Sequence, residues 1–152
     1  MTQEDKELLL KDLCARLPYG VKIVIQDTFK YSIVSQEYHV LDVSNFSDIF
    51  CFNYKKFDKR MKKAMREHPN DIVIKPYLFP LSSITEEQKS YINGRWGVNE
   101  HFEFEIDPLW GEYFVDVCDA VDFINWCYEN HFDINGLIPR GLAEDATDKN
   151  IY

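Results

Sequence analysis

The hydrophobic residues of this chain recur at two different spacings, and each spacing predicts a type of secondary structure. Between residues 3 and 17 the spacing is helical, because Leu9, Leu10, Leu13 and Leu17 recur on one helix face. Thr2 is placed to cap this helix, and Pro18 with Gly20 is placed to end it. We therefore expect an N-terminal helix that packs its leucine face inward.

Three segments with apolar residues at every second position follow this helix, and they are typical of half-buried strands. The segments cover residues 21–26, 29–34 and 38–43. The connections at 27–28 and 35–37 are short enough to be hairpin turns. The pattern therefore predicts a three-stranded antiparallel meander near the N-terminus.

The middle of the chain combines a strand pattern with two prolines. The β-branched run at 72–74 predicts a buried inner strand. Because proline cannot donate a hydrogen bond to a sheet, Pro76 and Pro80 predict that residues 77–79 lie at a strand end, at a sheet edge or in an extended crossing segment. The chain is expected to leave the sheet there.

Two overlapping capping-box patterns then predict a helix start near residues 84–86. One pattern begins at Ser83 and the other at Thr85, each with a glutamate or glutamine three positions later. Gly94 and Gly97 are expected to end this helix.

The last third of the chain predicts one more strand and one more helix. Apolar and acidic residues alternate at 102–106, which is the pattern of a half-buried strand. A helix is expected to begin after Asp116 or Asp119. Its expected inward face consists of Val117, Val121, Ile124 and Tyr128, flanked by Ala120, Phe123 and Cys127.

Together these elements predict one α+β domain that spans residues 1–152. Its sheet is expected to be antiparallel with about five strands, and its helices to pack mainly on one face of the sheet. With 152 residues, 45% of them hydrophobic, the chain is long enough to bury a core without a metal or disulfides. We expect no cofactor.

The chain opens on charged residues and contains no apolar run that is long enough for a membrane span. We therefore expect a soluble cytoplasmic protein that contacts no membrane. The cysteines form no CxxC motif and no paired Cys/His pattern, so free and mostly buried thiols are the expected state. They are Cys14, Cys51, Cys118 and Cys127.

The net charge of −9 argues against a simple binder of nucleic acid or of anionic membranes. The charge is uneven, however, because residues 55–67 hold seven Lys and Arg against two acidic residues. This segment reads as a basic amphipathic helix whose cations are candidate contacts for nucleic acid or for a partner. These cations are Lys55, Lys56, Lys59, Arg60, Lys62, Lys63 and Arg66. The alternative is an exposed basic face that pairs with acidic groups of the protein or of a partner.

A row of polar side chains occupies every second position of the predicted strand at 102–106 and of the residues that flank it. The row consists of three carboxylates and one imidazole. They are His101, Glu103, Glu105 and Asp107. Such a row could hold a divalent ion for phosphoryl chemistry, so it is the candidate metal site of a metal-dependent phosphoesterase. The competing interpretation is a solvated strand face, since the opposite face carries the apolar residues.

Two glycine-flanked tryptophans give a further candidate site. If these tryptophans are exposed, a partner or a small ligand such as a nucleotide could bind at Arg95, Trp96 and Trp110. If they are buried, the tryptophans fill the core. His131 beside Asp133 has the groups for acid–base chemistry, but no nucleophile accompanies them. The competing interpretation makes Asp133 a turn cap and places His131 at the C-terminus of the preceding helix. Signatures of P-loop, dinucleotide-binding, serine-hydrolase, zincin and EF-hand proteins are absent from the sequence, and no catalytic residue is assigned.

Three phrases of the sequence carry a resemblance. They are LPYGVKI at 17–23, IKPYLFPLSSITEEQ at 74–88 and WCYENHFDINGLIPRGLAEDAT at 126–147. The chain resembles a family of uncharacterised proteins from Bacteroides prophages and related gut phages and mobile elements. The resemblance implies a phage or mobile-element setting, and it supplies no activity, cofactor or catalytic residue.

We therefore expect a small, acidic, non-enzymatic cytoplasmic protein of a phage or mobile element. It is expected to act by binding another macromolecule, with a protein of the host or the phage as the first choice. The alternatives left open are nucleic-acid contact through residues 55–67, binding of a small ligand such as a nucleotide, and a phosphoesterase that uses the 101–107 carboxylates.

Overall fold

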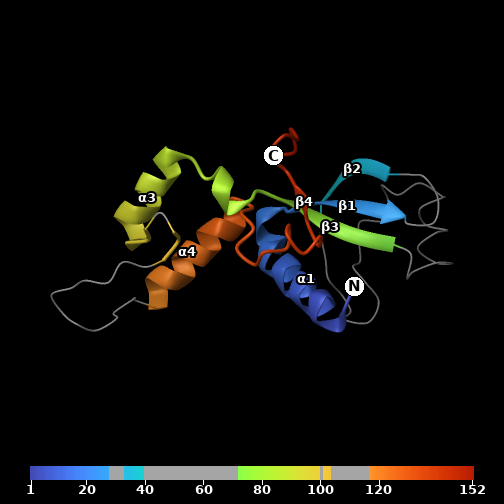
Figure 1. Cartoon of the computed structure of the whole chain (residues 1–152), viewed down its shortest axis with the longest axis horizontal. Helices are drawn as coiled ribbons and strands as arrows, with labels where there is room; N and C mark the ends of the chain where they lie inside the picture. Colours follow the sequence, from blue (N-terminus) through green and yellow to red (C-terminus); the bar gives the residue numbers. More distant parts are fainter. Residues whose placement is uncertain (28–32, 40–71, 100, 104–116) are drawn as a thin grey trace.

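The computed structural model describes residues 1–27, 33–39, 72–99, 101–103 and 117–152 (Figure 1). In chain order the described elements are α1 (Gln3–Arg16), η1 (Leu17–Tyr19), β1 (Lys22–Asp27), β2 (Ile33–His39), β3 (Ile72–Leu78), η4 (Leu81–Ser83), α3 (Glu86–Trp96), α4 (Val117–Glu129) and β4 (Glu144–Asp145). The elements marked η are single turns of 3₁₀ helix. This content confirms the prediction of an α+β protein.

α1 forms where the leucine repeat predicted it. The Thr2 hydroxyl accepts the Asp5 N–H at 3.1 Å, and the Asp5 carboxylate accepts the Thr2 N–H at 3.0 Å, which makes a capping box. The chain leaves the helix through η1 and turns at Gly20, whose φ of 67° is left-handed and favours glycine. Leu9 and Leu13 are buried against the sheet, as predicted.

The sheet has the strand order β2-β1-β3-β4. β1 pairs antiparallel with β2 on one side and with β3 on the other, whereas β4 pairs parallel with β3. The prediction of about five antiparallel strands is therefore wrong for the described residues. They form three strands of six or seven residues and a parallel fourth of two. A strand of two residues cannot show an alternation, so β4 left no pattern in the sequence.

β1 and β2 pair antiparallel, as the predicted meander required, but Asp27 of the first expected turn lies in β1, and the second predicted turn is wrong. Residues 35–37 lie inside β2, which pairs with β1 between Ile33 and His39. Serine is common in turns and glutamate is mildly depleted in strands, and the pairing with β1 overrides these preferences. The remainder of the third predicted strand, residues 40–43, lies outside the described residues.

β3 is an inner strand, as the β-branched run predicted, and Tyr77 and Leu78 form its end, which is one of the positions that the two prolines predicted for them. It pairs with β1 up to Pro76 and with β4 from Tyr77 onward. Pro76 is thus the last residue of the pairing with β1, where a missing N–H is tolerated. Beyond β3, the Phe79 N–H donates to the His131 carbonyl at 2.9 Å, and the Asp133 N–H donates to the Phe79 carbonyl at 2.8 Å. β3 therefore leads directly to the chain that follows α4.

α3 uses the second of the two predicted capping boxes. The Thr85 hydroxyl accepts the Gln88 N–H at 3.2 Å, and the Gln88 side chain accepts the Thr85 N–H at 2.9 Å. The Ser83 hydroxyl donates instead to the backbone carbonyl three residues earlier, at 2.7 Å. Gly97 ends the helix with a φ of 63°, whereas Gly94 lies inside it.

The described core has two main clusters. One lies between α1 and the sheet and includes Leu13, Ile23 and Leu78. The other lies between α3 and α4 and includes Ile92 and Phe123. Figure 1 shows α1 beside the sheet and the α3–α4 pair at the opposite end of the molecule. Within the described chain, the predicted packing of helices on the sheet therefore holds for α1, while α3 and α4 pack on each other.

Candidate functional site

α4 exposes the face that the sequence predicted to be buried. Val117, Val121 and Ile124 are 75%, 48% and 41% exposed. Phe123 and Cys127, which were expected to flank the inward face, are the buried residues of the helix. The prediction is therefore wrong for these positions. Val117, Val121 and Ile124 form an exposed line at helical spacing, which we call the apolar stripe.

The aromatic neighbours of α4 explain this orientation. The ring of Trp96 on α3 lies 5.8 Å from that of Phe123 and 6.0 Å from that of Trp126, between centroids. Aromatic side chains bury more apolar area than valine, so enclosing them between the two helices stabilises the fold more than burying the stripe. Apolar residues occupy most positions of α4, so helical spacing alone could not select the inward face.

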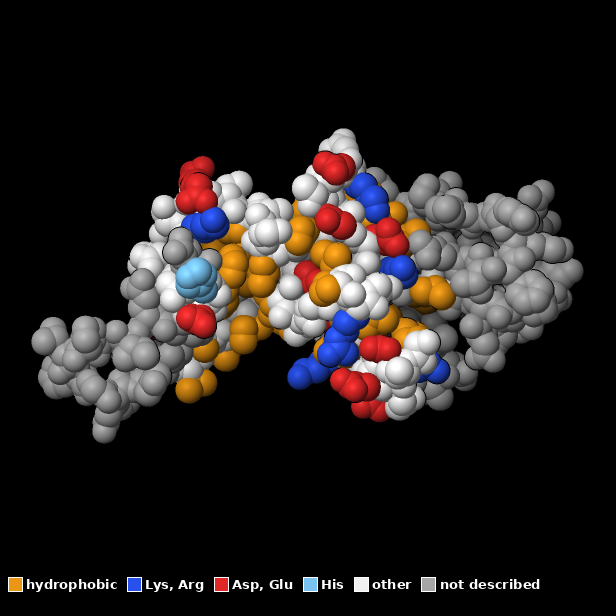
Figure 2. All heavy atoms as spheres, viewed as in Figure 1, with side chains coloured by type: hydrophobic (Ala, Val, Ile, Leu, Met, Phe, Trp, Pro, Cys, Tyr) orange, Lys and Arg blue, Asp and Glu red, His pale blue; other side chains and the backbone are white. Residues whose placement is uncertain are grey.

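A second exposed line runs beside the apolar stripe, one residue further along the helix. Its members, called the acidic line, are Cys118, Asp122, Asn125 and Glu129. Two of them are carboxylates, and α4 contains no lysine or arginine. Asp119, on the α3 side of the helix, has its Oδ1 3.9 Å from Nη1 of Arg95. Figure 2 shows hydrophobic side chains gathered along α4.

The described thiols differ from the expected burial. Cys14 and Cys118 are exposed, whereas Cys127 is buried. Burial raises the pKa of the Cys127 thiol to about 12. No disulfide joins these three cysteines, and Cys51 lies outside the described residues. An exposed thiol therefore stands beside the apolar stripe, at Cys118.

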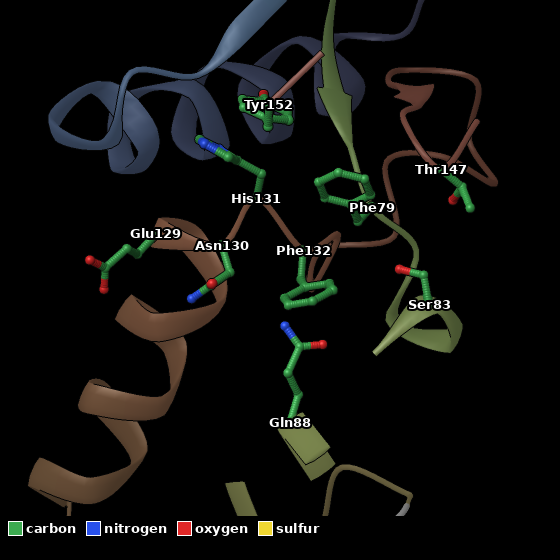
Figure 3. A pocket seen from close by; sticks show the side chains of 9 residues that line it. All are labelled: Phe79, Ser83, Gln88, Glu129, Asn130, His131, Phe132, Thr147 and Tyr152. Atoms are coloured by element: carbon green, nitrogen blue, oxygen red, sulfur yellow. The ribbon is translucent and has the colours of Figure 1, made fainter. Parts of the chain in front are cut away.

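A cleft of about 570 Å³ opens between the start of α3, the end of α4 and the last residues of the chain (Figure 3). It is lined by Phe79, Ser83, Gln88, Glu129, Asn130, His131, Phe132, Thr147 and Tyr152. Several of its polar side chains already hydrogen-bond within the protein. The Ser83 hydroxyl donates to a backbone carbonyl at 2.7 Å, the Thr147 hydroxyl to a neighbouring carboxylate at 2.6 Å and the Asn130 amide to a backbone carbonyl at 2.9 Å.

His131 lines this cleft in a backbone conformation that is unusual for histidine. It follows α4 with a φ of 60°; its N–H donates to the Tyr128 carbonyl, and the Phe132 N–H donates to the Cys127 carbonyl. These two bonds form a Schellman motif, whose left-handed residue is usually glycine. The His131 side chain stacks on Tyr152, with 3.9 Å between ring centroids and 16° between ring planes.

The two stacked rings are not poised for proton transfer near neutral pH. Burial, followed by the positive charges of Arg16 and Lys22, lowers the pKa of His131 to about 4, so the imidazole is neutral at pH 7. Burial raises the pKa of Tyr152 to about 12, and its hydroxyl donates to the Tyr77 carbonyl at 2.9 Å. The environment thus moves both pKa values away from the range in which a general base or acid works best.

Asp133 has the capping role that competed with acid–base chemistry in the sequence. Its carboxylate accepts the N–H groups of Leu137 and Ile138, both at 2.8 Å. The side chain is buried, and these two hydrogen bonds stabilise the turn. The turn-cap interpretation is therefore confirmed.

A buried ion pair that the sequence analysis missed joins α1 to the segment after α4. Arg16 donates to Asp12 from Nε at 2.7 Å and from Nη2 at 3.0 Å, and both side chains are 0% exposed. Arg16 Nη2 also donates to the Phe132 carbonyl at 2.7 Å, and Asn135 Nδ2 donates to Asp12 at 2.8 Å. Helical spacing was the available signal, because both charged residues stand on the same face of α1 as its buried leucines.

The structure describes only some of the remaining candidate residues. The basic segment 55–67 and Trp110 lie outside the described residues, so their roles stay predictions. Arg95 is exposed and faces Asp119, while Trp96 is 9% exposed in the cluster between α3 and α4. The core interpretation is thus confirmed for Trp96, and neither Arg95 nor Trp96 lines the cleft.

The predicted strand at 102–106 starts as a turn in the structure. Asn99 Oδ1 accepts the N–H of His101 at 2.9 Å and that of Glu103 at 3.0 Å. Asparagine side chains favour such turns, and this local bond outweighs the alternation of the sequence. His101 and Glu103 therefore do not share a strand face. Glu105 and Asp107 lie outside the described residues, and no group of three metal-ligating side chains forms within the part of the chain that is described.

Comparison of the chain with protein-family models, with curated proteins and with solved structures found no significant match. The phage setting therefore stays a prediction that rests on the three phrases quoted above. All lining residues of the cleft except Tyr152 belong to the phrases at 74–88 and 126–147. Those phrases and the acid–base candidate His131 were the sequence signals for this region. Among the described helices, none is both long and apolar enough to cross a membrane.

Proposed function

We propose that this chain is a non-enzymatic binding module that holds a protein partner on the apolar stripe of α4. The observation that carries the proposal is the exposure of three β-branched side chains, Val117, Val121 and Ile124, on one helix face. Contiguous exposed apolar surface on a soluble protein marks sites of association. A helix with such a stripe binds by laying it against a groove or another helix.

A protein fits this surface better than a nucleic acid does. Contacts to phosphates need lysine or arginine side chains, and α4 has neither. The exposed charges beside the stripe are the carboxylates of Asp122 and Glu129, which would repel a phosphate backbone. Nucleic-acid contact through residues 55–67 stays a separate prediction.

The cleft supports a reaction centre less well than the apolar stripe supports the binding of a partner. A serine or threonine nucleophile needs a base within hydrogen-bond reach. The hydroxyls of Ser83 and Thr147 donate to other groups, and the His131 ring is buried against Tyr152. We therefore place the activity of the chain on its surface.

We place this binding in the cytoplasm of a cell that carries the phage or mobile element. The three phrases at 17–23, 74–88 and 126–147 and the acidic composition of the chain motivate this setting. The partner is then a protein of the host or of the element itself.

Co-purification with matched variants tests the proposal. Val121→Asp and Ile124→Asp each place a carboxylate in the apolar stripe, and Cys14→Asp places the same group at an exposed position of α1. We expect the wild-type chain and Cys14→Asp to retain one protein partner from cells that carry the element, and both stripe variants to retain roughly tenfold less. Equal retention by folded stripe variants, checked by circular dichroism, would refute the proposal.

A further inference from the structure

The surroundings of the apolar stripe specify the kind of partner that fits it, and this inference rests on the proposed function of α4. Each residue of an α-helix advances by about 100° around the helix axis. The apolar stripe, the acidic line and the buried side of α4 therefore occupy neighbouring sectors of its surface. Tyr128 closes the stripe at its C-terminal end, where the Arg16 guanidinium lies 4.9 Å from the ring centroid. The open surface is therefore narrow and straight, and it has one charged border.

The shape of the stripe favours a helix as the docking element. From Val117 to Ile124 it extends about 10 Å along the axis at 1.5 Å per residue. β-branched side chains form a low ridge, so a second helix can approach to the usual axis separation of about 8–10 Å. A strand would have no edge to pair with, because the backbone groups in the middle of a helix are already bonded within it.

The charge beside the stripe favours a basic helix. Asp122 and Glu129 are exposed and stand two helical turns apart, and no cation of α4 neutralises them. We propose that the partner presents a basic amphipathic helix, with an aliphatic seam on the apolar stripe and Lys or Arg side chains over the acidic line. Opposite charges along one flank also fix the direction in which the partner helix lies.

The α4 helix of a second copy fits the same surface less well. If two α4 helices paired antiparallel through their stripes, equivalent flanks would face each other. Asp122 and Glu129 of one copy would then meet the same carboxylates of the other, and like charges brought together in an interface are unfavourable. The charge of the flank therefore selects a basic helix over a second α4.

Two synthetic peptides test the inference. Both carry the same leucine seam on a helix, one flanked by lysines and its twin by glutamates. Binding to the full-length protein is followed by fluorescence anisotropy, and the oligomeric state by light scattering. The flank variant is Asp122→Lys with Glu129→Lys. The matched control, Glu87→Lys with Asp148→Lys, changes the net charge equally at exposed positions off α4.

We expect the lysine peptide to bind the wild-type protein at least about tenfold more tightly than the glutamate twin. Val121→Asp and the flank variant should each weaken that binding about tenfold, and the control should change it less than about threefold. Equal binding of both peptides, or equal weakening by flank variant and control, overturns the basic-helix partner. A wild-type dimer that Val121→Asp dissociates overturns it in favour of a second copy. If the peptide test fails but co-purification still depends on Val121, only the basic-helix partner is refuted. If co-purification does not depend on Val121 either, the proposed function is refuted.

Discussion

The imidazole of His131 lies nearly flat against the phenol ring of Tyr152, 3.9 Å between centroids, while the His131 backbone holds a left-handed φ of 60°. That conformation costs a residue with a Cβ about 1–2 kcal/mol. The stack of the buried His131 ring on Tyr152 offsets this cost and ties the end of α4 to the last residue of the described chain. Backbone strain and ring contact can be measured separately.

Replacing His131 with glycine and with alanine isolates the backbone strain. Both variants lose the ring, but glycine adopts the left-handed conformation without a steric penalty. We expect His131→Gly to be more stable than His131→Ala by about 1 kcal/mol in urea unfolding. A glycine variant that is no more stable than the alanine variant would contradict the Schellman geometry at the end of α4.

Protonation of His131 should destabilise the fold at acidic pH. Its folded pKa of about 4 lies below the unfolded value near 6.5, so between these values the unfolded chain binds the proton and the folded chain does not. Stability should therefore fall as the pH drops from about 6.5 to 4, by up to about 3 kcal/mol from this group.

His131→Asn is the control for this pH dependence, because asparagine tolerates the left-handed conformation and does not titrate. The contributions of the other titrating groups to stability cancel when wild type and variant are compared. The difference in free energy of unfolding, wild type minus variant, should shrink by roughly 2–3 kcal/mol between pH 7 and pH 4. Parallel pH curves for the two proteins would show that the His131 pKa is not lowered.

The buried pair of Asp12 and Arg16 should behave as one unit. Arg16→Met leaves the Asp12 carboxylate buried without its cation, and we expect a loss of about 3–5 kcal/mol in the free energy of unfolding. Asp12→Leu combined with Arg16→Met removes both charges. The double variant should lose at least about 2 kcal/mol less than the sum of the single losses.

A double-mutant cycle in urea checks this coupling. If Arg16→Met does not fold, recovery of helical circular dichroism in the double variant gives the same answer. Additive losses, or a double variant less folded than Arg16→Met, would contradict the burial of the pair.

The capping box before α3 predicts that the Thr85 hydroxyl stabilises the start of this helix. Thr85→Ala removes the acceptor of the Gln88 N–H and should cost about 1 kcal/mol. Ser82→Ala, at an exposed neighbouring position, should change stability by less than about 0.5 kcal/mol. Thermal unfolding of the two variants compares them directly, and a larger loss for Ser82→Ala would contradict the assigned cap.

The sequence predicted best the features that are set by nearby residues. The N-cap at Thr2, the capping box at Thr85 and the glycines at 20 and 97 located the ends of α1 and α3, because each depends on bonds within a few residues. The turn expected at 35–37 failed where pairing with a distant strand decided the backbone.

The candidate site depended on contacts that the sequence pattern cannot express. α4 is apolar on most of its circumference, and the aromatic contact with Trp96 decides which side is buried. The sequence placed His131 at the end of the helix but gave no sign of its left-handed backbone, because that position is normally marked by glycine. The buried side of α4 and the stack of His131 on Tyr152 became visible only when segments far apart in the chain were brought together.

Site-specific photo-crosslinking from Cys118 tests the central claim most directly, because this exposed thiol lies in the acidic line beside the apolar stripe. Cys14 and Cys51 are changed to serine, and Cys127 is protected by burial and a pKa of about 12. A chain labelled only at exposed Cys14 is the matched control. We predict one protein partner crosslinked from Cys118, absent from Cys14 and lost when Val121→Asp is added. The same products from both thiols, or a Cys118 product that survives Val121→Asp, would contradict a partner-binding surface on α4.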